Sequence, residues 1–262
     1  MTDIGTRIRR ARLKADSSQV VVRLAGLGDI EEIREVEMAA WGPASAAPPE
    51  KIASRIQIYP EGQRVGVASS SGTIVGFVST MRLSATQAST LSSWSQVTDD
   101  GFITGHTPNG DHLYGVDMSV SPEWQCRGLG NRLLSEIAAM VIEQRMKFAL
   151  LGGRLPGLRE FNQRRVAEGK PAVEAGGYVL LRRPDGKALD PELRFYQGIW
   201  FLESIGLLPN YFPDPDSLDF GVLLRWRNPL FRWFCCFGAL YRTPATRRLA
   251  VRSLASIVKR LL

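Results

Sequence analysis

The sequence is short of the residue types that build disulfide frameworks and metal sites. Its 262 residues contain three cysteines, Cys126 and the adjacent pair Cys235 and Cys236, and two histidines, His106 and His112. Neither the number nor the spacing of the cysteines fits a disulfide framework or a CxxC zinc knuckle. Two histidines are also too few for a histidine-rich metal site. We therefore expect no resident metal ion and a reducing, cytoplasmic compartment.

Long apolar runs are missing as well. The best stretch of this kind, PLFRWFCCFGALY at 229–241, is shorter than the roughly 18 residues that a membrane-spanning helix needs, and it contains Arg232. Residues 1–19 lack the apolar segment of a secretion signal. These absences predict a protein that does not span a membrane, and we interpret residues 1–18 as a mobile basic arm.

Acidic residues are absent from the C-terminal part of the chain. From Phe220 to Leu262 the sequence has nine lysines and arginines and no aspartate or glutamate, and residues 1–18 have five basic and two acidic side chains. Because the whole chain carries a net charge of +7, the residues between these ends are net negative. The basic ends suit an acidic partner or surface, whereas the acidic middle argues against a nucleic-acid-binding core.

Residues 244–262 predict an amphipathic basic helix. Such a helix suits peripheral contact with an anionic membrane surface, where each basic residue contributes about 1 kcal/mol. Docking on the protein's own body or on a second subunit is the alternative, so an oligomer also stays open. The apolar face of this helix consists of Val251, Leu254, Ile257, Val258 and Leu261.

The rest of the chain alternates short strands and helices. A β-branched strand near residue 20 precedes Asp29, which is predicted to cap a helix, and a second short helix ends before Pro60. Residues 64–83 predict an antiparallel hairpin, and 112–120 predict a strand followed by a helix that begins near Asn131. A further strand, a short helix and two more strands complete the body. This order is typical of an α+β fold whose sheet has helices on both faces.

The stretch SVSPEWQCRGLGNRLL, residues 119–134, carries the most informative local pattern. Its connection, 125–130, lies between a strand end and a helix start, where unpaired N–H groups and the positive end of the helix dipole converge. Gly128 and Gly130 have no Cβ, which lets a diphosphate approach the main chain, and Arg127 adds a full positive charge. The alternative is an ordinary glycine turn.

The full string Q-x-R-G-x-G in this position resembles the acetyl-CoA loop of the GNAT acyltransferase superfamily. The order of elements over about 19–228 agrees with the GNAT fold, a mixed and mostly antiparallel twisted sheet with helices on both faces. The blocks LYGVDMSVSPEWQCRGLG, GGRLPG and LPNYFPDPDSLDFGVLLRWRNP narrow the resemblance to the GNAT module that is often fused to a carbon–nitrogen hydrolase. Here we expect a stand-alone version.

The resemblance implies acetyl-CoA or another acyl-CoA as co-substrate. Backbone groups of Met118 and Val120 would pair with the pantetheine arm, and the thioester would lie in a V-shaped gap beside this strand. Tyr196, in RFYQ, lies where many GNAT enzymes keep a tyrosine that protonates the leaving thiolate; an ordinary buried tyrosine is the alternative. By the same resemblance, the pyrophosphate would be held by Gln125, Cys126, Arg127, Gly128, Leu129, Gly130 and Asn131.

An amine acceptor must lose a proton as it attacks, so the reaction needs a general base. Asp117, on the central predicted strand, is one candidate, and His106 and His112 titrate near neutral pH. Each has a structural alternative: Asp117 would satisfy a loop, His112 would be a surface residue at a strand start, and His106 would belong to a turn.

The segments SRIQIYPEGQ, VSTMRL and HTPNG also resemble the GNAT-like loading domains of polyketide synthases. Those domains decarboxylate malonyl thioesters and move the acyl group to a carrier-protein thiol. The resemblance implies that Thr80 and His106 would bind the thioester oxygen as the enolate forms. A third reading is a non-catalytic scaffold that binds acyl-CoA.

These arguments predict an acyltransferase, specifically an N-acetyltransferase, that moves an acyl group from CoA directly to the amine of a small molecule. The predicted organisation is the basic arm 1–18, the acyltransferase domain 19–228 with insertions near 84–111 and 158–189, and the basic helical tail 229–262. The two insertions contain no motif that identifies the acceptor.

Overall fold

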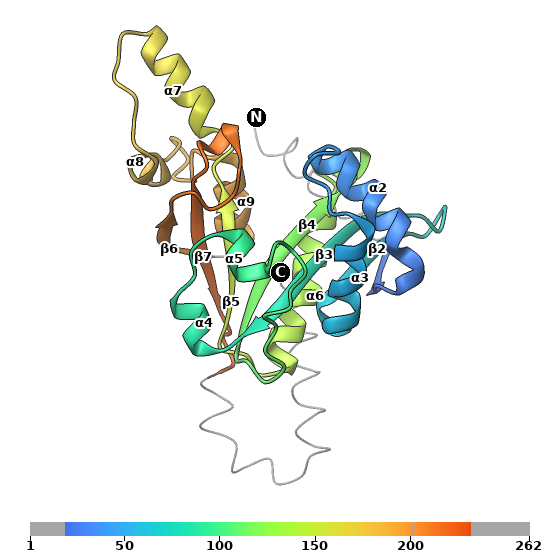
Figure 1. The fold of residues 1–262 in the computed structure, drawn as a ribbon. Helices are drawn as coiled ribbons and strands as arrows, with labels where there is room; N and C mark the ends of the chain where they lie inside the picture. Colours follow the sequence, from blue (N-terminus) through green and yellow to red (C-terminus); the bar gives the residue numbers. More distant parts are fainter. Residues whose placement is uncertain (1–18, 201, 232–262) are drawn as a thin grey trace.

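A twisted seven-stranded sheet runs through residues 19–200 and 202–231, the part of the chain described by the structure, a computed structural model. The strand order is β1-β2-β3-β4-β5-β7-β6 (Figure 1). Within this sheet β4 and β5 run parallel, and the other neighbouring pairs are antiparallel. The predicted α+β class is confirmed. The strands are β1 (Val20–Leu24), β2 (Gln63–Ala68), β3 (Ile74–Leu83), β4 (His112–Val120), β5 (Phe148–Arg154), β6 (Glu203–Leu208) and β7 (Gly221–Arg227).

Helices cover both faces of the sheet because successive residues of a strand point to opposite sides. Phe77 of β3 packs with Ile33 of α2 in the apolar cluster of one face. Its neighbour Val78 packs in the cluster of Leu133 of α6 on the other face. Burial of each such side chain contributes about 1.5–3 kcal/mol. The principal helices are α2 (Ile30–Trp41), α3 (Pro49–Ile58), α6 (Leu129–Glu143) and α9 (Pro191–Trp200).

Both predicted insertions contain regular structure. The flap (residues 84–111) includes the short helices α4 (Ala85–Ser89) and α5 (Trp94–Thr98). The arm (residues 158–189) includes α7 (Leu158–Ala167) and α8 (Ala175–Leu180), and it projects from the upper end of the sheet in Figure 1. The four 3-10 turns are η1 (Leu27–Asp29), η2 (Pro60–Gly62), η3 (Pro122–Trp124) and η4 (Pro215–Ser217).

Three local predictions need correction. The helix expected near Asn131 begins at Leu129, because Gly128 turns the chain into it with φ of +85°. His112 is buried, with 8% of its surface exposed, because its Nδ1 lies 2.6 Å from Asp111 Oδ1 and its ring packs against Phe148. Asp29 stands at the N-cap of α2, but its carboxylate bonds the N–H of Gly26 and the guanidinium of Arg23 instead of the helix.

Several predictions concern segments that lie outside the described residues. They are the basic arm 1–18, the amphipathic tail helix 244–262, and the pair Cys235 and Cys236. The limits of the acyltransferase domain, 19–228, stay a prediction. None of the helices in the described ranges is long and apolar enough to cross a bilayer.

Tyr211, in the loop between β6 and β7, packs directly on the sheet at two glycines. A Cβ at position 152 would lie 2.0 Å from Cζ of Tyr211, and a Cβ at position 221 would lie 2.5 Å from its Cδ1. The Tyr211 hydroxyl is 2.6 Å from the hydroxyl of Tyr114 on β4. The absence of side chains at Gly152 and Gly221 therefore lets one tyrosine connect the loop to the centre of the sheet.

Replacing Gly152 tests this packing. We expect Gly152→Ala to displace the Tyr211 ring and to lower the free energy of unfolding by about 1–3 kcal/mol, as overpacking of a buried site does. The matched control is Gly176→Ala in α8, where an added Cβ meets nothing within 4 Å and stability should not fall. Urea unfolding of both variants measures this. Equal stability of Gly152→Ala and wild type would contradict the described packing.

Candidate active site

The parallel strands β4 and β5 separate before they end. Their paired positions run from His112 opposite Phe148 to Gly115 opposite Leu151. Beyond these positions β4 continues to Val120 and β5 to Arg154. The ends of the two strands therefore form the V-shaped gap that the resemblance implied, and we refer to it as the strand gap (residues 116–120 and 152–154).

A β-bulge in β4 marks the start of the strand gap. Ser79 of β3 lies opposite Asp117, whereas Thr80 lies opposite Gly115, so Val116 is an extra residue on β4. A bulge bends its strand and increases the local twist. The carbonyl of Val116 accepts a hydrogen bond of 2.8 Å from the indole N–H of Trp94 in the flap. The flap is thereby held at the bulge.

The backbone beyond the bulge directs polar groups into the strand gap. Ser121 N–H donates to the Val75 carbonyl on the β3 side at 3.0 Å. Because strand residues alternate in the side to which their backbone groups point, Met118 and Val120 face away from β3. The side chain of Gln125 donates to the Val120 carbonyl at 3.1 Å, which agrees with this orientation.

The glycine loop between β4 and α6 presents N–H groups beside the gap. Cys126 and Gly128 both have positive φ, +58° and +85°. The first N–H that bonds back into the helix is that of Arg132, to the Gly128 carbonyl at 3.1 Å. The N–H groups of Leu129 and Gly130 lie before it, in the first turn of α6. N–H groups and a helix dipole at such a position favour an anion, and an anion-binding role of this loop stays a prediction.

Side chains of the loop differ in their roles. Gln125 and Cys126 are exposed, and the guanidinium of Arg127 lies 5.6 Å from the ring centroid of Trp124. The side chain of Leu129 is fully buried in the core beneath Gly66 and Gly76, so Leu129 can contribute to a ligand site only through its backbone. Gly130 faces Phe195 of α9, and an added Cβ would lie 3.3 Å from that ring.

Asp117 lies in a hydrogen-bonded row that extends from β4 to α2. The Ser119 hydroxyl donates to Asp117 Oδ2 at 2.9 Å, and the indole N–H of Trp41 donates to the same hydroxyl oxygen at 2.7 Å. The row fixes the carboxylate of Asp117 by two elements rather than by a loop. The general-base role of Asp117 stays a prediction.

Glu37 of α2 lies behind Asp117 and was missed in the sequence. It is 2% exposed, its Oε2 accepts the N–H of Ala47 at 2.6 Å, and its Oε1 lies 3.4 Å from Arg55 Nη1. Burial, and next the neighbouring Asp117, raises the pKa of Glu37 to about 8. The Nε of Arg55 donates to the carbonyl of Gly101 at 2.8 Å, which connects this group to the flap.

Tyr196 of α9 is buried, with Phe195 packed edge-on against its ring. Burial raises the pKa of the Tyr196 hydroxyl well above its usual value, and the negative charges of Glu192 and Asp117 raise it further. The hydroxyl therefore keeps its proton at neutral pH. The roles of Tyr196 as acid and of Asp117 as base stay predictions.

Arg154 lies at the end of β5 and reaches towards α2. Its Nε donates to Asp214 Oδ2 at 2.7 Å, and its guanidinium carbon lies 5.3 Å from the ring centroid of Trp41. Its backbone N–H donates to Glu192 Oε1 at 2.9 Å, and burial raises the pKa of Glu192 to about 7. The cation–π contact, worth about 0.5–1 kcal/mol at a partly exposed site, joins α2 to the end of β5.

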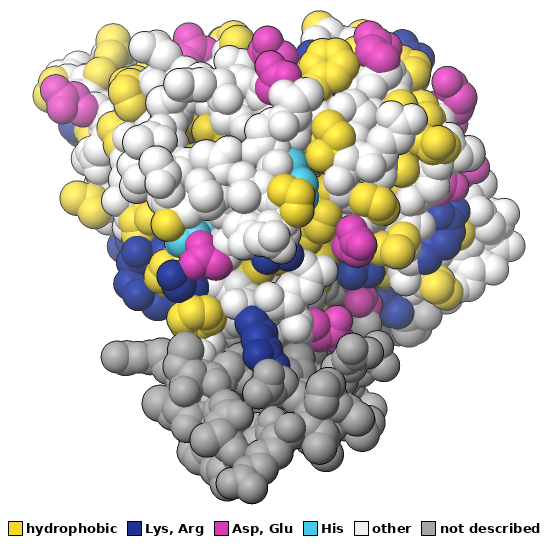
Figure 2. Space-filling view, turned by 60° about the horizontal axis from the view of Figure 1, so that its bottom comes forward, with side chains coloured by type: hydrophobic (Ala, Val, Ile, Leu, Met, Phe, Trp, Pro, Cys, Tyr) yellow, Lys and Arg dark blue, Asp and Glu magenta, His cyan; other side chains and the backbone are white. Residues whose placement is uncertain are grey.

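Thr80 and His106, the two residues that the decarboxylase hypothesis would use, both form hydrogen bonds within the protein. The Thr80 hydroxyl is buried and donates to the Gly62 carbonyl at 2.9 Å. His106 stacks on the ring of Tyr59 at 4.5 Å, and its Nδ1 accepts the N–H of Arg82 at 3.0 Å. Burial lowers the pKa of His106, so its ring is neutral at pH 7. Figure 2 shows histidine side chains, in cyan, at two separate places on this face of the molecule.

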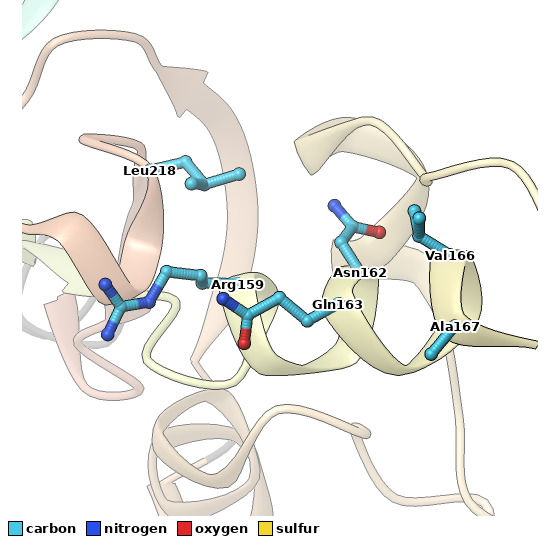
Figure 3. A pocket seen from close by; sticks show the side chains of 6 residues that line it. All are labelled: Arg159, Asn162, Gln163, Val166, Ala167 and Leu218. Atoms are coloured by element: carbon cyan, nitrogen blue, oxygen red, sulfur yellow. The ribbon is translucent and has the colours of Figure 1, made fainter.

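A shallow hollow lies elsewhere, along α7 of the arm. Its volume is about 480 Å³, and Figure 3 shows that Leu218 faces the side chains of α7 across it. It contains none of the residues of the strand gap or the glycine loop. The hollow is lined by Arg159, Asn162, Gln163, Val166, Ala167 and Leu218.

Comparison with known proteins agrees with this geometry. The model of the acetyltransferase (GNAT) family matches residues 30–153. Uncharacterized N-acetyltransferase YkwB of Bacillus subtilis is 30% identical over 187 residues, which cover 71% of this chain and 77% of that protein. The chain belongs to the GNAT acetyltransferase family.

A second relative of this GNAT chain is much longer. Probable hydrolase YhcX of Bacillus subtilis is 28% identical over 211 residues, which cover 80% of this chain and 39% of that protein. The chain therefore spans less than half the length of this relative. Its match agrees with the predicted resemblance to a GNAT module that accompanies a hydrolase.

Solved structures share the GNAT fold. The loading GNATL domain of CurA from Lyngbya majuscula has a TM-score of 0.65 and 24% identity, covering 80% of this chain and 98% of that one. The GphF GNAT-like decarboxylase in complex with isobutyryl-CoA has a TM-score of 0.64 and 22% identity, covering 79% and 99%. At these identities the likeness establishes a common fold, and it does not extend to the reaction.

The pH dependence of stability tests the environment of Glu37. The folded state raises the pKa of Glu37 from 4.5 to about 8 and so binds its proton more tightly than the unfolded chain does. This contribution to stability is complete below the unfolded pKa and is lost as the pH rises towards 8. We expect the wild-type free energy of unfolding to fall, relative to Glu37→Gln, between about pH 5 and pH 8.

Urea unfolding at several pH values measures this difference. Glu35→Gln is the matched control, because Glu35 lies on the same helix and is exposed; its curve should run parallel to that of wild type. A wild-type minus Glu37→Gln difference that stays constant with pH would contradict the raised pKa.

Proposed function

We propose that this GNAT protein transfers an acyl group from acetyl-CoA or a related acyl-CoA to the amine of a small molecule by direct attack. The observation that carries the proposal is the strand gap between β4 and β5, which opens beside the N–H groups of the glycine loop. A strand gap of this kind offers backbone partners to an extended amide-containing arm, and the loop offers donors to phosphate.

On the donor side, the backbone of Met118 and Val120 would pair with the pantetheine arm. The pyrophosphate would be held by the N–H groups of residues 125–131, with Arg127 adding positive charge. Bound acyl-CoA supplies the activated thioester. The role of the chain is to hold this thioester in the strand gap and to exclude water from it.

On the acceptor side, Asp117 acts as the general base and Tyr196 as the general acid. The amine nitrogen attacks the thioester carbonyl, a C–N bond forms and the C–S bond breaks. The proton lost by nitrogen passes to Asp117, and the leaving thiolate takes the proton of the Tyr196 hydroxyl. Proton return from Asp117 to Tyr196 through the buried site restores both groups, so that the products are an amide and CoA thiol.

The location of the acceptor follows from the walls of this site. Trp41 of α2, Arg154 of β5 and the flap held at Val116 enclose Asp117 and Ser119. A small-molecule amine in its neutral form, with Asp117 as the carboxylate that accepts its proton, suits these surroundings. Peripheral contact of the C-terminal helix with a membrane, and a cytoplasmic location, remain predictions of the sequence.

Malonyl-thioester decarboxylation, with acyl transfer to a carrier protein, is the second candidate. It is favoured by the likeness in fold to the GphF decarboxylase. In that case Thr80 and His106 would bind the thioester oxygen. We propose amine acylation first, because both of these polar groups already bond the backbone, whereas Asp117 lies on β4 beyond the last position that pairs with β5.

The glycine loop is tested by a charge-reversing substitution. Gly128→Glu places a carboxylate and a Cβ where φ is +85° and where phosphate would bind, so we expect loss of CoA binding by at least about 100-fold. Gly72→Glu is the matched control, because Gly72 also has positive φ, +74°, and an added Cβ meets nothing within 4 Å. Isothermal titration with CoA measures both affinities. Equal affinity of wild type and Gly128→Glu would show that the loop is an ordinary turn that does not bind CoA.

The acid and base are tested by conservative variants. We expect Tyr196→Phe and Asp117→Asn each to lower kcat by on the order of 100-fold, with the KM for acetyl-CoA nearly unchanged, because general acid–base groups act in the chemical step. Tyr178→Phe is the matched control, since Tyr178 is a buried tyrosine of α8 that bonds Asp190. The measurement is CoA thiol release with acetyl-CoA and a panel of primary amines.

Malonyl-CoA in the same assay separates the alternatives. The protein would be a decarboxylase if it converts malonyl-CoA to acetyl-CoA and if this activity is lost in Thr80→Val but retained in Tyr196→Phe. That result would contradict the proposal of amine acylation. CoA binding without turnover of any donor would identify a non-catalytic acyl-CoA-binding module.

A further inference from the structure

The guanidinium of Arg154 has donors that the protein leaves available. Its Nε donates to Asp214 Oδ2 at 2.7 Å, and its carbon lies 5.3 Å from the ring centroid of Trp41. Within residues 19–200 and 202–231, Nη1 and Nη2 have no hydrogen-bond partner, and neither atom is among the buried polar atoms that lack one. Both Nη groups are therefore accessible, and their N–H donors can meet a ligand.

Two contacts hold this side chain in one orientation. Asp214 is 6% exposed, and its carboxylate also accepts the hydroxyl of Ser217 and, at 3.3 Å, the N–H of Asp216. Trp41, on which the guanidinium packs, is itself fixed by the hydrogen bond of 2.7 Å from its indole N–H to Ser119 of β4. An arginine held in this way loses little further rotamer freedom when a ligand binds.

Arg154 lies across the strand gap from Asp117. Arg154 is the last residue of β5, and Asp117 lies on β4 beyond Gly115, the last position that pairs with β5. Trp41 and Ser119 connect the two, because Arg154 packs on the indole, the indole donates to the hydroxyl, and the hydroxyl donates to Asp117 Oδ2 at 2.9 Å. One acceptor molecule could therefore meet both, with its amine at Asp117 and an anionic group at Arg154.

The charges around Arg154 decide which anion fits. Asp214 already offsets its positive charge. Glu192 accepts the backbone N–H of Arg154 at 2.9 Å, and burial raises the pKa of this carboxyl to about 7. A doubly charged phosphate would add two negative charges beside these carboxyl groups. A carboxylate adds only one, and its two oxygens match the two Nη groups of a guanidinium in a bidentate pair.

We propose that Arg154 binds a carboxylate of the acceptor, so that the substrate is a small amine that also carries a carboxyl group, such as an amino acid. The inference rests on the proposed function, since it concerns the acceptor of that reaction. Nη1 and Nη2 each donate to one carboxylate oxygen, while Nε stays on Asp214 and the ring of Trp41 supports the face of the guanidinium. The amine of the same molecule then lies at Asp117.

Matched amines test the substrate class. The panel contains the standard amino acids, the C-terminal amide of each, and aminomethylphosphonate, the phosphonate analogue of glycine, all at equal concentrations of neutral amine. CoA release from acetyl-CoA is measured. We expect wild type to prefer its best amino acid over the corresponding amide by about 10- to 100-fold in kcat/KM, as a charge-assisted bidentate pair provides. Equal use of amino acids and amides, or a preference for aminomethylphosphonate over glycine, would overturn the carboxylate assignment and leave amine acylation standing.

Substitutions of Arg154 test the residue itself. Arg154→Lys keeps the charge beside Asp214 but lacks the planar fork, and Arg154→Gln removes the charge. In both we expect the ratio of kcat/KM for the amino acid to that for its amide to fall about tenfold or more, with the affinity for acetyl-CoA unchanged. An unchanged ratio in both variants would overturn the proposal.

Arg225→Lys is the matched control. Arg225 also bonds a carboxylate, that of Glu203, and its guanidinium carbon lies 5.3 Å from the ring centroid of Phe148. It stands opposite Leu150, outside the strand gap. The ratio of kcat/KM in this variant should therefore equal that of wild type.

Thermal unfolding of the CoA-bound protein gives a readout that does not need the reaction. At equal ionic strength we expect amino acids of the panel to raise the melting temperature of wild type and Arg225→Lys more than their amides do, and this difference to vanish in Arg154→Lys. No difference in wild type would overturn the inference. A difference that depends on Arg154, with no amine acylated, would uphold the carboxylate site and contradict the proposed function instead.

Discussion

The constraint on which the site depends is the parting of β4 and β5 after Gly115 and Leu151. Two neighbouring parallel strands normally satisfy each other's backbone groups along their whole length. Here the last residues of both strands lack this pairing, and buried backbone groups must find other partners. Two of the carbonyls accept hydrogen bonds from side chains: Val116 from the indole of Trp94, and Val120 from the amide of Gln125. The remaining backbone groups face the strand gap, where an extended ligand can pair with them.

In the proposed function, different elements around the strand gap would bind the acyl-CoA donor and the acceptor amine. The glycine loop and the start of α6 lie at the end of β4 and offer positive partial charge. Asp117 lies on β4, Glu37 on α2 and Glu192 on α9, and burial raises the pKa of both Glu37 and Glu192. In the proposed reaction, the N–H groups of the glycine loop would bind the phosphates of the donor, and Asp117 would take the proton that the acceptor gives up.

The sequence predicted the parts of the fold that depend on local pattern. The strand at 112–120 was predicted, and the string Q-x-R-G-x-G predicted a glycine turn before a helix, because glycine spacing before a helix has a local cause. Tyr211 and Arg154 could not be predicted, since their roles arise from contacts with Tyr114 and Trp41, far away in the chain. One feature of the sequence could have pointed to Glu37. It lies four residues after Ile33, on the apolar face of α2, where a carboxylate is rare.

A crystal structure with bound acetyl-CoA tests the account most directly. The account predicts pantetheine between β4 and β5, with its amides bonded to the backbone of Met118 and Val120. It also predicts the pyrophosphate on the N–H groups of Gly128, Leu129 and Gly130, and the thioester sulfur beside the hydroxyl of Tyr196. Acetyl-CoA bound elsewhere, such as in the hollow along α7, with the strand gap closed, would contradict it.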